Sequence, residues 1–232
     1  MKKLWKWLDN FWYHHKWKTI IISFFLIVFV IGFVQCMQKT DADVSILYVG
    51  PEVVTGEDYD AMEKSLESRL GIDYNEDGKI TVQFTDRVYL SDAQLKEREE
   101  AAAADGEALY YDKTAMKNSL DQARQWIQSG AMLIAIMDVE VYKTFERVQD
   151  SLFVKLDDYL DEVPEYAYDA YSLTFKDIPY VQFSGAFDSI AKDTVIVLVK
   201  PTWTSTLGKD EMAERYRAHE ELMQKIVKFS VK

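Results

Sequence analysis

The chain has 232 residues with 27 basic and 39 acidic side chains, and its formal net charge is −12. Beyond residue 40 the balance is 21 basic against 38 acidic residues, a net charge of −17. Nucleic-acid binding requires a basic surface, so this composition argues against nucleic acid as a partner. The length beyond residue 40 suffices for one domain with a complete core, or at most two small ones.

The first 18 residues form a segment rich in tryptophan, tyrosine and lysine. Aromatic side chains favour the headgroup region of a membrane, and lysines favour anionic lipid of the inner leaflet. Trp5, Leu8 and Trp12 fall near helical spacing, which predicts a short helix lying in the interface. His14 and His15 have no further metal ligands close by in the sequence, so we expect them to be interfacial residues rather than a metal site.

Residues 19–37 form an uncharged stretch of 19 residues. A helix of this length spans roughly 28 Å, close to the ~30 Å hydrocarbon core of a bilayer, so the stretch predicts a transmembrane helix. Lysines are concentrated before the stretch, while Asp41 and Asp43 follow it. The positive-inside rule therefore places residues 1–18 in the cytoplasm and the chain beyond the span outside it.

The outer end of this span leaves other interpretations open. It offers no small-x-small cleavage site, and Gln35 stands where a bacterial lipobox has a small residue before Cys36. We therefore expect an uncleaved anchor, with a cleaved or lipidated form as the alternative. Cys36 is the only cysteine, so it is either a lone thiol or a partner in an intermolecular disulfide.

A polar stalk at 38–43 leads to an opening unit that reads strand, helix, strand. Residues 44–49 are a β-rich apolar run stopped by Gly50 and Pro51, and residues 57–70 are an amphipathic helix stopped by Gly71. A turn at 73–78 precedes an alternating strand at 79–84. Such units build parallel sheets with a helical crossover.

The rest of the chain continues this alternation. A polar helix is expected at 91–111, outside the core and able to move, because it has little apolar face. The other expected elements are helices at 113–129, 139–148 and 209–229 and strands at 132–137, 171–175 and 194–199. The last helix should pack its face of Met212, Tyr216, Met223 and Ile226 on the sheet. The sequence thus predicts a single α/β domain over 44–232 with a mostly parallel sheet flanked by helices.

Residues 44–200 resemble the first lobe of the solute-binding proteins of ABC transporters, the type 2 periplasmic-binding fold. The segments that carry the resemblance are ILYVG, ITVQF, ARQWIQSGAMLIAIMD, VEVYKTF, FVKLDDYL and YSLTFKDIPYVQF. The resemblance implies a sheet with flanking helices and a ligand-binding role. A working receptor of that class clamps its ligand between two lobes, whereas this chain has room for one helix after Pro201. Only one lobe is expected.

A calcium-like half-loop lies in the turn at 73–78. Asp73, Asn75 and Asp77 supply oxygens at positions 1, 3 and 5 of an EF-hand loop, and Gly78 occupies position 6. Phe84 stands where the bidentate glutamate should be. We expect a tight turn with weak calcium binding at most, and no other cofactor.

Candidate ligand-binding residues follow the predicted strands. Gly50, Asp86, Arg87 and Asp138 come at the carboxyl ends of strands, where open α/β sheets bind ligands. A second candidate is a groove of aromatic residues for sugar or peptide, with ordinary packing as the alternative; its members are Tyr166, Tyr168, Tyr171, Tyr180, Phe183, Phe187 and Trp203. His219 lies on an apolar helix face and is expected to be a buried core histidine.

No catalytic constellation is present in the sequence: it has no phosphate loop, no Gly-x-Ser-x-Gly and no Cys/His pair. We therefore expect a membrane-anchored protein-interaction or scaffold domain rather than an enzyme. The alternative is a membrane-tethered solute receptor for a transporter or sensor. A receptor should show a deep, partly apolar pocket at the strand ends, and a scaffold a shallow exposed patch.

Overall fold

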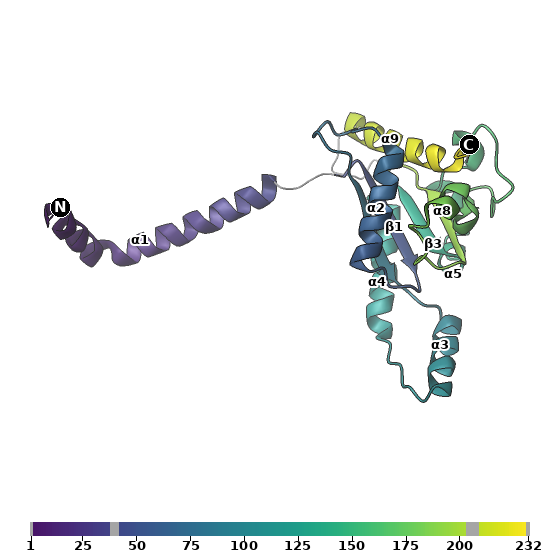
Figure 1. The fold of residues 1–232 in the computed structure, drawn as a ribbon, viewed down its shortest axis with the longest axis horizontal. Helices are drawn as coiled ribbons and strands as arrows, with labels where there is room; N and C mark the ends of the chain where they lie inside the picture. The colour runs from purple at the N-terminus through teal and green to yellow at the C-terminus, as the bar shows by residue number, and fades with distance from the viewer. Residues whose placement is uncertain (1, 38–41, 203–208, 231–232) are drawn as a thin grey trace. The chain divides into compact units, whose positions relative to one another are not determined.

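The computed structural model describes residues 2–37, 42–202 and 209–230. The chain divides into two compact units, Met1–Asp41 and Ala42–Lys232 (Figure 1). Most of the predicted stalk and the predicted groove residue Trp203 lie outside the described residues.

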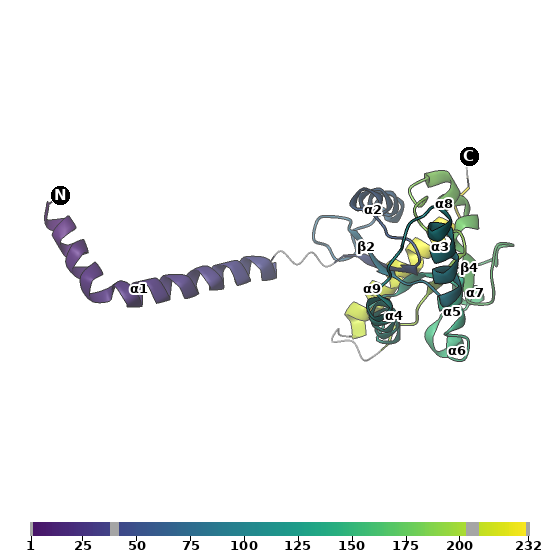
Figure 2. The same cartoon turned by 90° about the horizontal axis from the view of Figure 1, so that it is seen from below.

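The first unit is one helix, α1, which spans Lys2–Met37. Its most apolar window is His15–Gly32, and within the described part of the chain α1 is the one helix long and apolar enough to cross a membrane. Both views show that α1 bends toward its N-terminal end (Figures 1 and 2). The helix therefore extends well beyond the apolar window on its N-terminal side.

The second unit is built on a five-stranded sheet in the order β2-β1-β3-β5-β4. The strands are β1 (Val44–Gly50), β2 (Val82–Val88), β3 (Ile134–Asp138), β4 (Ser172–Thr174) and β5 (Thr194–Leu198). β1 pairs in parallel with β2 and β3, whereas β5 pairs antiparallel with β3 and β4. The α/β class is confirmed, but the sheet is mixed rather than mostly parallel. The prediction of a mostly parallel sheet was wrong for β5, because this strand is buried throughout and carries no residue pattern that sets its direction.

Helices cover both faces of this sheet. On one face α2 (Gly56–Leu70) and α9 (Lys209–Val227) pack against β1 through Met62, Leu66 and Leu222. On the other face α4 (Lys113–Gln128) and α5 (Val139–Lys143) pack against Leu47 and Val49. Alternate residues of β1 thus enter two separate cores, as the two-residue period of a strand requires.

Local signals explain where the best-predicted helices begin and end. α2 starts with a capping box between Thr55 and Asp58, and Gly71 ends it with φ of 66°. α4 buries Met116, Leu120, Ala123 and Ile127, the face that their spacing predicts. In α9, Met212, Met223 and Ile226 are buried and Tyr216 packs against the same core, which confirms the predicted face.

The bounds predicted for the helix at 91–111 and for the strand at 79–84 were wrong. α3 spans Asp92–Ala104 and stops seven residues before the predicted end, because Gly106 reverses the chain with φ of 76°. β2 starts at Val82 and runs to Val88, four residues past the predicted end, so Asp86 and Arg87 lie within the strand.

Short elements fill the region between β3 and β5. The predicted helix at 139–148 shortens to α5, and the following elements are α6 (Gln149–Leu152), α7 (Leu156–Tyr159), the 3-10 helix η1 (Phe175–Asp177) and α8 (Pro179–Ser184). Buried aromatic side chains, among them Phe153, Phe175 and Phe187, hold these turns against the sheet.

Candidate functional site

The candidate site is a cleft at the carboxyl ends of β1 and β3. The chain leaves β1 toward α2 on one face of the sheet and leaves β3 toward α5 on the other face. Adjacent parallel strands whose connections diverge in this way open a crevice where α/β proteins bind ligands. We call this cleft the switch-point cleft.

The switch-point cleft has a volume of about 620 Å³. Its lining comes from the segment after β1, from α3, from the end of β3 and from the loop before β5: Pro51, Glu52, Gln94, Glu97, Arg98, Ala101, Asp138 and residues 188–193. None of these residues is aromatic, and most of them are polar or charged.

Asp138 forms the base of the cleft at the end of β3. Its side chain is 2% exposed, and its two carboxylate oxygens have different partners. Oδ1 accepts the backbone N–H of Glu140 at 2.8 Å and so caps α5, while Oδ2 accepts the side-chain amide of Gln94 at 2.9 Å. These bonds stabilise the buried carboxylate, because burying a charge without partners is costly.

α3 forms one wall of the cleft and is fastened through its first two turns. Gln94 completes a capping box with Ser91 by accepting the Ser91 N–H at 2.8 Å, and its amide nitrogen reaches Asp138. One turn later, Arg98 donates to Glu52 at 2.7 Å. Both side chains of this pair are more than a third exposed, so it contributes at most about 1 kcal/mol. The rest of α3 and the segment that leads to α4 project from one end of the domain (Figure 1).

The loop at 188–193 forms the opposite wall. It is tied to the start of α5, directly after β3, by the Val139 N–H, which donates to the Asp193 carbonyl at 3.0 Å. The hydroxyl of Ser189 is shielded from solvent and finds no hydrogen-bond partner within the described residues. An unsatisfied buried hydroxyl costs free energy, so this oxygen is available to a bound group or a water molecule.

The charge of the cleft is acidic. Its lining holds five acidic side chains, from Glu52, Glu97, Asp138, Asp188 and Asp193, against the two basic ones of Arg98 and Lys192. Glu97, Asp188 and Asp193 are exposed. The geometry therefore suits a cationic group entering from solvent, and it presents no nucleophile paired with a base.

Gly50 lies beside the cleft rather than in its lining. A Cβ at this position would overlap the side chain of Tyr48, whose ring is fully buried. The Tyr48 hydroxyl accepts the N–H of Glu52 at 3.4 Å, and burial raises the pKa of Tyr48 to about 12. Gly50 thus shapes the turn after β1 by leaving room for Tyr48, which is a structural role.

Asp86 and Arg87 were predicted wrongly as strand-end residues, and the structure does not bring them to the cleft. Neighbouring residues of a strand point to opposite faces, so the two side chains separate. Asp86 accepts the Tyr59 hydroxyl at 2.5 Å on the α2 face; burial and then this bond raise the pKa of Tyr59. Arg87 lies 4.3 Å from the ring centroid of Trp126 in α4. Both residues fasten β2 to its neighbouring helices.

The calcium-like turn uses one side-chain oxygen each of Asp73, Asn75 and Asp77 for the turn itself, whereas Asp73 Oδ1 is buried and has no hydrogen-bond partner among the described residues. Asp73 accepts the Gly78 N–H at 2.8 Å, Asn75 the Asp77 N–H at 3.0 Å, and Asp77 the Lys79 N–H at 2.9 Å. Within the described residues no group of three or more His, Cys, Asp or Glu side chains is placed to hold a metal ion. Weak calcium binding at this turn stays a prediction.

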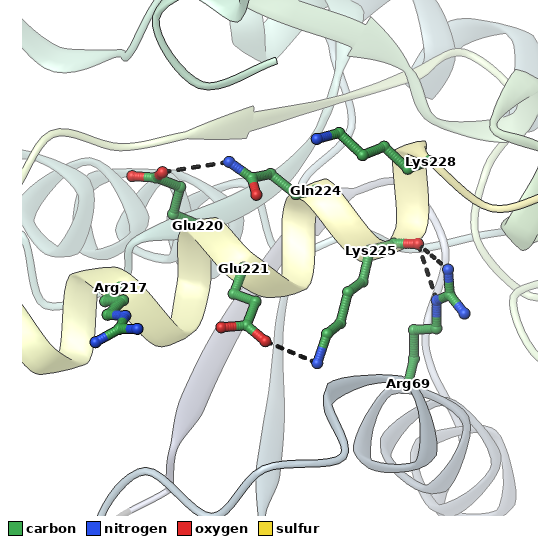
Figure 3. A pocket seen from close by; sticks show the side chains of 7 residues that line it. All are labelled: Arg69, Arg217, Glu220, Glu221, Gln224, Lys225 and Lys228. Atoms are coloured by element: carbon green, nitrogen blue, oxygen red, sulfur yellow. Dashed lines mark hydrogen bonds and ion pairs between the residues drawn. The ribbon is translucent and has the colours of Figure 1, made fainter. Parts of the chain in front are cut away.

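A second hollow, of about 440 Å³, lies along α9, and Figure 3 shows its side chains. Most of its charged groups already have partners: Lys225 pairs with Glu221 at 2.8 Å, and Arg69 donates to the Lys225 carbonyl at 2.8 Å. Lys228 pairs with Asp161 at 2.6 Å. These contacts join α2 and the segment after α7 to α9. We therefore infer that the residues lining this hollow have a structural role.

The predicted aromatic groove does not form at the cleft. Tyr180 and Phe187 are buried in the core, which confirms the packing alternative for these two. Tyr168 and Phe183 are exposed, but none of the described aromatic candidates lines the switch-point cleft. His219 is fully buried, as predicted.

Of the predicted site residues, only Asp138 lines the cleft. Sequence reasoning missed Glu52, Gln94, Arg98 and the loop before β5. One signal was available: Gln94 and Arg98 are four residues apart on a helix without an apolar face, so they share one side of α3. Leu95 is the one large apolar residue of α3 and is buried, but a single apolar position does not show which neighbouring element the helix meets.

Comparison of the chain with protein-family models, with curated proteins and with solved structures finds no match.

Proposed function

We propose that this chain is a membrane-anchored extracytoplasmic α/β domain that binds a basic segment of a partner protein in the switch-point cleft. The acidic, mostly polar lining of a cleft at the strand ends is the observation that carries this proposal. Charge complementarity gives specificity and fast association in protein–protein contacts. The role is one of binding, with no chemical step.

The anchor is supported by α1 and by the lysines before its apolar window. The predicted orientation puts residues 1–18 in the cytoplasm and the α/β domain outside. Protease added to intact cells should then remove the domain and spare an N-terminal tag. Protection of a C-terminal tag would overturn this orientation.

A second candidate is the membrane-tethered solute receptor, in line with the proposed likeness to one lobe of a solute-binding protein. One observation favours it: the cleft volume falls within the range of about 300–1,000 Å³ that is usual for small-ligand sites. Such sites are mostly apolar and aromatic, however, and this lining has neither character. The protein-binding role is therefore the better supported of the two.

Site-specific photocrosslinking tests the proposal in intact cells. A benzophenone amino acid replaces Ala101, an exposed residue that lines the cleft, and in a matched control it replaces Ala115, an exposed residue of α4. We expect a discrete protein adduct from position 101 and none from position 115. Equal adducts at both positions, or none at position 101, would overturn the protein-binding role. In the second case, calorimetric titration with small cations such as arginine and putrescine tests the receptor.

A further inference from the structure

The N-terminal part of α1 has a sharply divided sequence. At 100° per residue, the six apolar positions between 2 and 13 fall within an arc of about 160°. These positions are Leu4, Trp5, Trp7, Leu8, Phe11 and Trp12. The six polar positions fall within the remaining arc, and three of them are Lys2, Lys3 and Lys6. The segment 2–13 is therefore strongly amphipathic, and we call it the surface helix.

The surface helix is the part of α1 that precedes the apolar window. α1 has 36 residues, about 54 Å of helix, whereas a bilayer core is only ~30 Å thick. The apolar window begins at His15, after the surface helix ends. The bend of α1 toward its N-terminal end lets this part leave the direction of the span (Figures 1 and 2).

Tryptophan side chains on the apolar side of the surface helix are exposed. Trp5 is 72% exposed and Trp12 is 52% exposed. An isolated helix of 12 residues is marginal in water, so its stability must come from burying this face. Within 1–18, five lysines stand against Asp9, a net charge of +4.

We infer that the surface helix lies on the membrane and binds anionic phospholipid headgroups on the same side as the N-terminus. Its apolar face enters the boundary between headgroups and acyl chains, and its lysines contact the negative headgroups. This lipid contact rests on the proposed membrane anchor. It adds a lipid preference that a spanning helix alone does not give.

Spin labels on the full chain test the lipid contact in nanodiscs. In the Cys36→Ser background, Leu8→Cys labels the apolar arc, and Asn10→Cys is the matched control on the polar arc. The discs contain phosphatidylcholine alone or with phosphatidylserine, and collision rates with oxygen and with a water-soluble nickel chelate report depth. With phosphatidylserine we expect label 8 to favour oxygen and label 10 to favour the chelate.

Two changes should abolish this contrast: omission of phosphatidylserine, and the triple change Lys2→Gln, Lys3→Gln and Lys6→Gln. Three lysines near an anionic surface shift the ratio of surface-bound to detached helix on the order of 100-fold. Replacing three exposed lysines of the domain, Lys64, Lys79 and Lys96, should leave the contrast unchanged.

Equal chelate access at labels 8 and 10, or equal depth in both lipid mixtures, would overturn the inference. A label at Phe29→Cys, within the apolar window, distinguishes failure of the lipid contact from failure of the membrane anchor. If that label is buried while labels 8 and 10 stay in water, the anchor holds and the lipid contact fails. If label 29 is in water, both fail.

Discussion

The imidazole of His219 joins α9 to β1 at the point where the domain begins. Its Nε2 accepts the backbone N–H of Ser45 at 3.0 Å, so the Nδ1 proton is the one donated to the Arg215 carbonyl, 2.7 Å away. The side chain is fully buried, and burial lowers the pKa of His219 to about 4. Protonation would cost the Ser45 bond and would place a charge in the core.

The buried His219 makes the domain sensitive to acid. In the unfolded chain the imidazole takes a proton near pH 6.5, whereas in the folded chain it does so only near pH 4. Stability is therefore complete above pH 6.5 and falls as the pH drops toward 4, by about 1.4 kcal/mol per pH unit and about 3 kcal/mol in total. NMR of ¹³C-labelled histidine in the full chain, with His14 and His15 changed to Gln, should show a midpoint near 4. A midpoint near 6.5 would contradict the buried geometry.

Gly50→Ala should destabilise the domain, because the new Cβ overlaps the Tyr48 ring. Overpacking of this kind costs about 1–3 kcal/mol. Gly56→Ala is the matched control: Gly56 is the first residue of α2, and a Cβ there meets nothing within 4 Å. It should be neutral or stabilising by up to about 1 kcal/mol. Thermal unfolding of both variants checks this, and equal midpoints would show that the turn adapts.

Glutamates of α2 protect the edge of the sheet. Glu63 accepts the Phe84 N–H at 2.8 Å, and Glu67 accepts the Val82 N–H at 3.3 Å, so two outward N–H groups of edge strand β2 are blocked. The double change Glu63→Ala and Glu67→Ala should expose this edge and promote self-association, because open edges pair with other chains. Light scattering against concentration measures it. The control pair Asp60→Ala and Lys64→Ala, both exposed on α2, should scatter like the parent chain.

Gln94→Ala should loosen α3. The change removes one capping bond and the bond to Asp138, a loss of about 1–2 kcal/mol for the local structure. Hydrogen exchange of the α3 amides should accelerate on the order of tenfold while the β3 amides change little. Lys96→Ala removes only an exposed pair with Glu100 and serves as the control. Equal exchange in both variants would mean that Gln94 does not fasten the cleft wall.

The fold was predictable where local signals act alone. Gly71 ends α2 and the spacing of Leu120 and Ile127 marks α4, because both depend on residues close in sequence. The direction of β5 and the start of β2 depend on which strand lies alongside, and no residue in Thr194–Leu198 carries that information. The sequence therefore predicted secondary structure more reliably than it predicted strand pairing.

For the candidate site, the sequence predicted only the general location, at the carboxyl ends of the strands. Asp138 was identified because it ends a strongly apolar strand. Glu52 and Arg98 meet across 46 residues, and their contact depends on how α3 docks, which a polar helix does not encode in its pattern. The prediction that Asp86 follows its strand was wrong because β2 continues past it to Val88.

The protein-binding role of the switch-point cleft is tested most directly by removing acidic charge from the cleft and measuring the yield of the photocrosslinked adduct from position 101. The cleft variant carries Glu97→Gln, Asp188→Asn and Asp193→Asn, and the control carries Asp60→Asn, Glu107→Gln and Asp121→Asn at exposed positions outside the lining. A tenfold loss of affinity corresponds to about 1.4 kcal/mol of binding free energy, which is a moderate combined contribution from three charges at the rim of the cleft. We predict that the yield falls by about that factor in the cleft variant and is unchanged in the control. Equal yields from the two variants would contradict recognition by the acidic cleft.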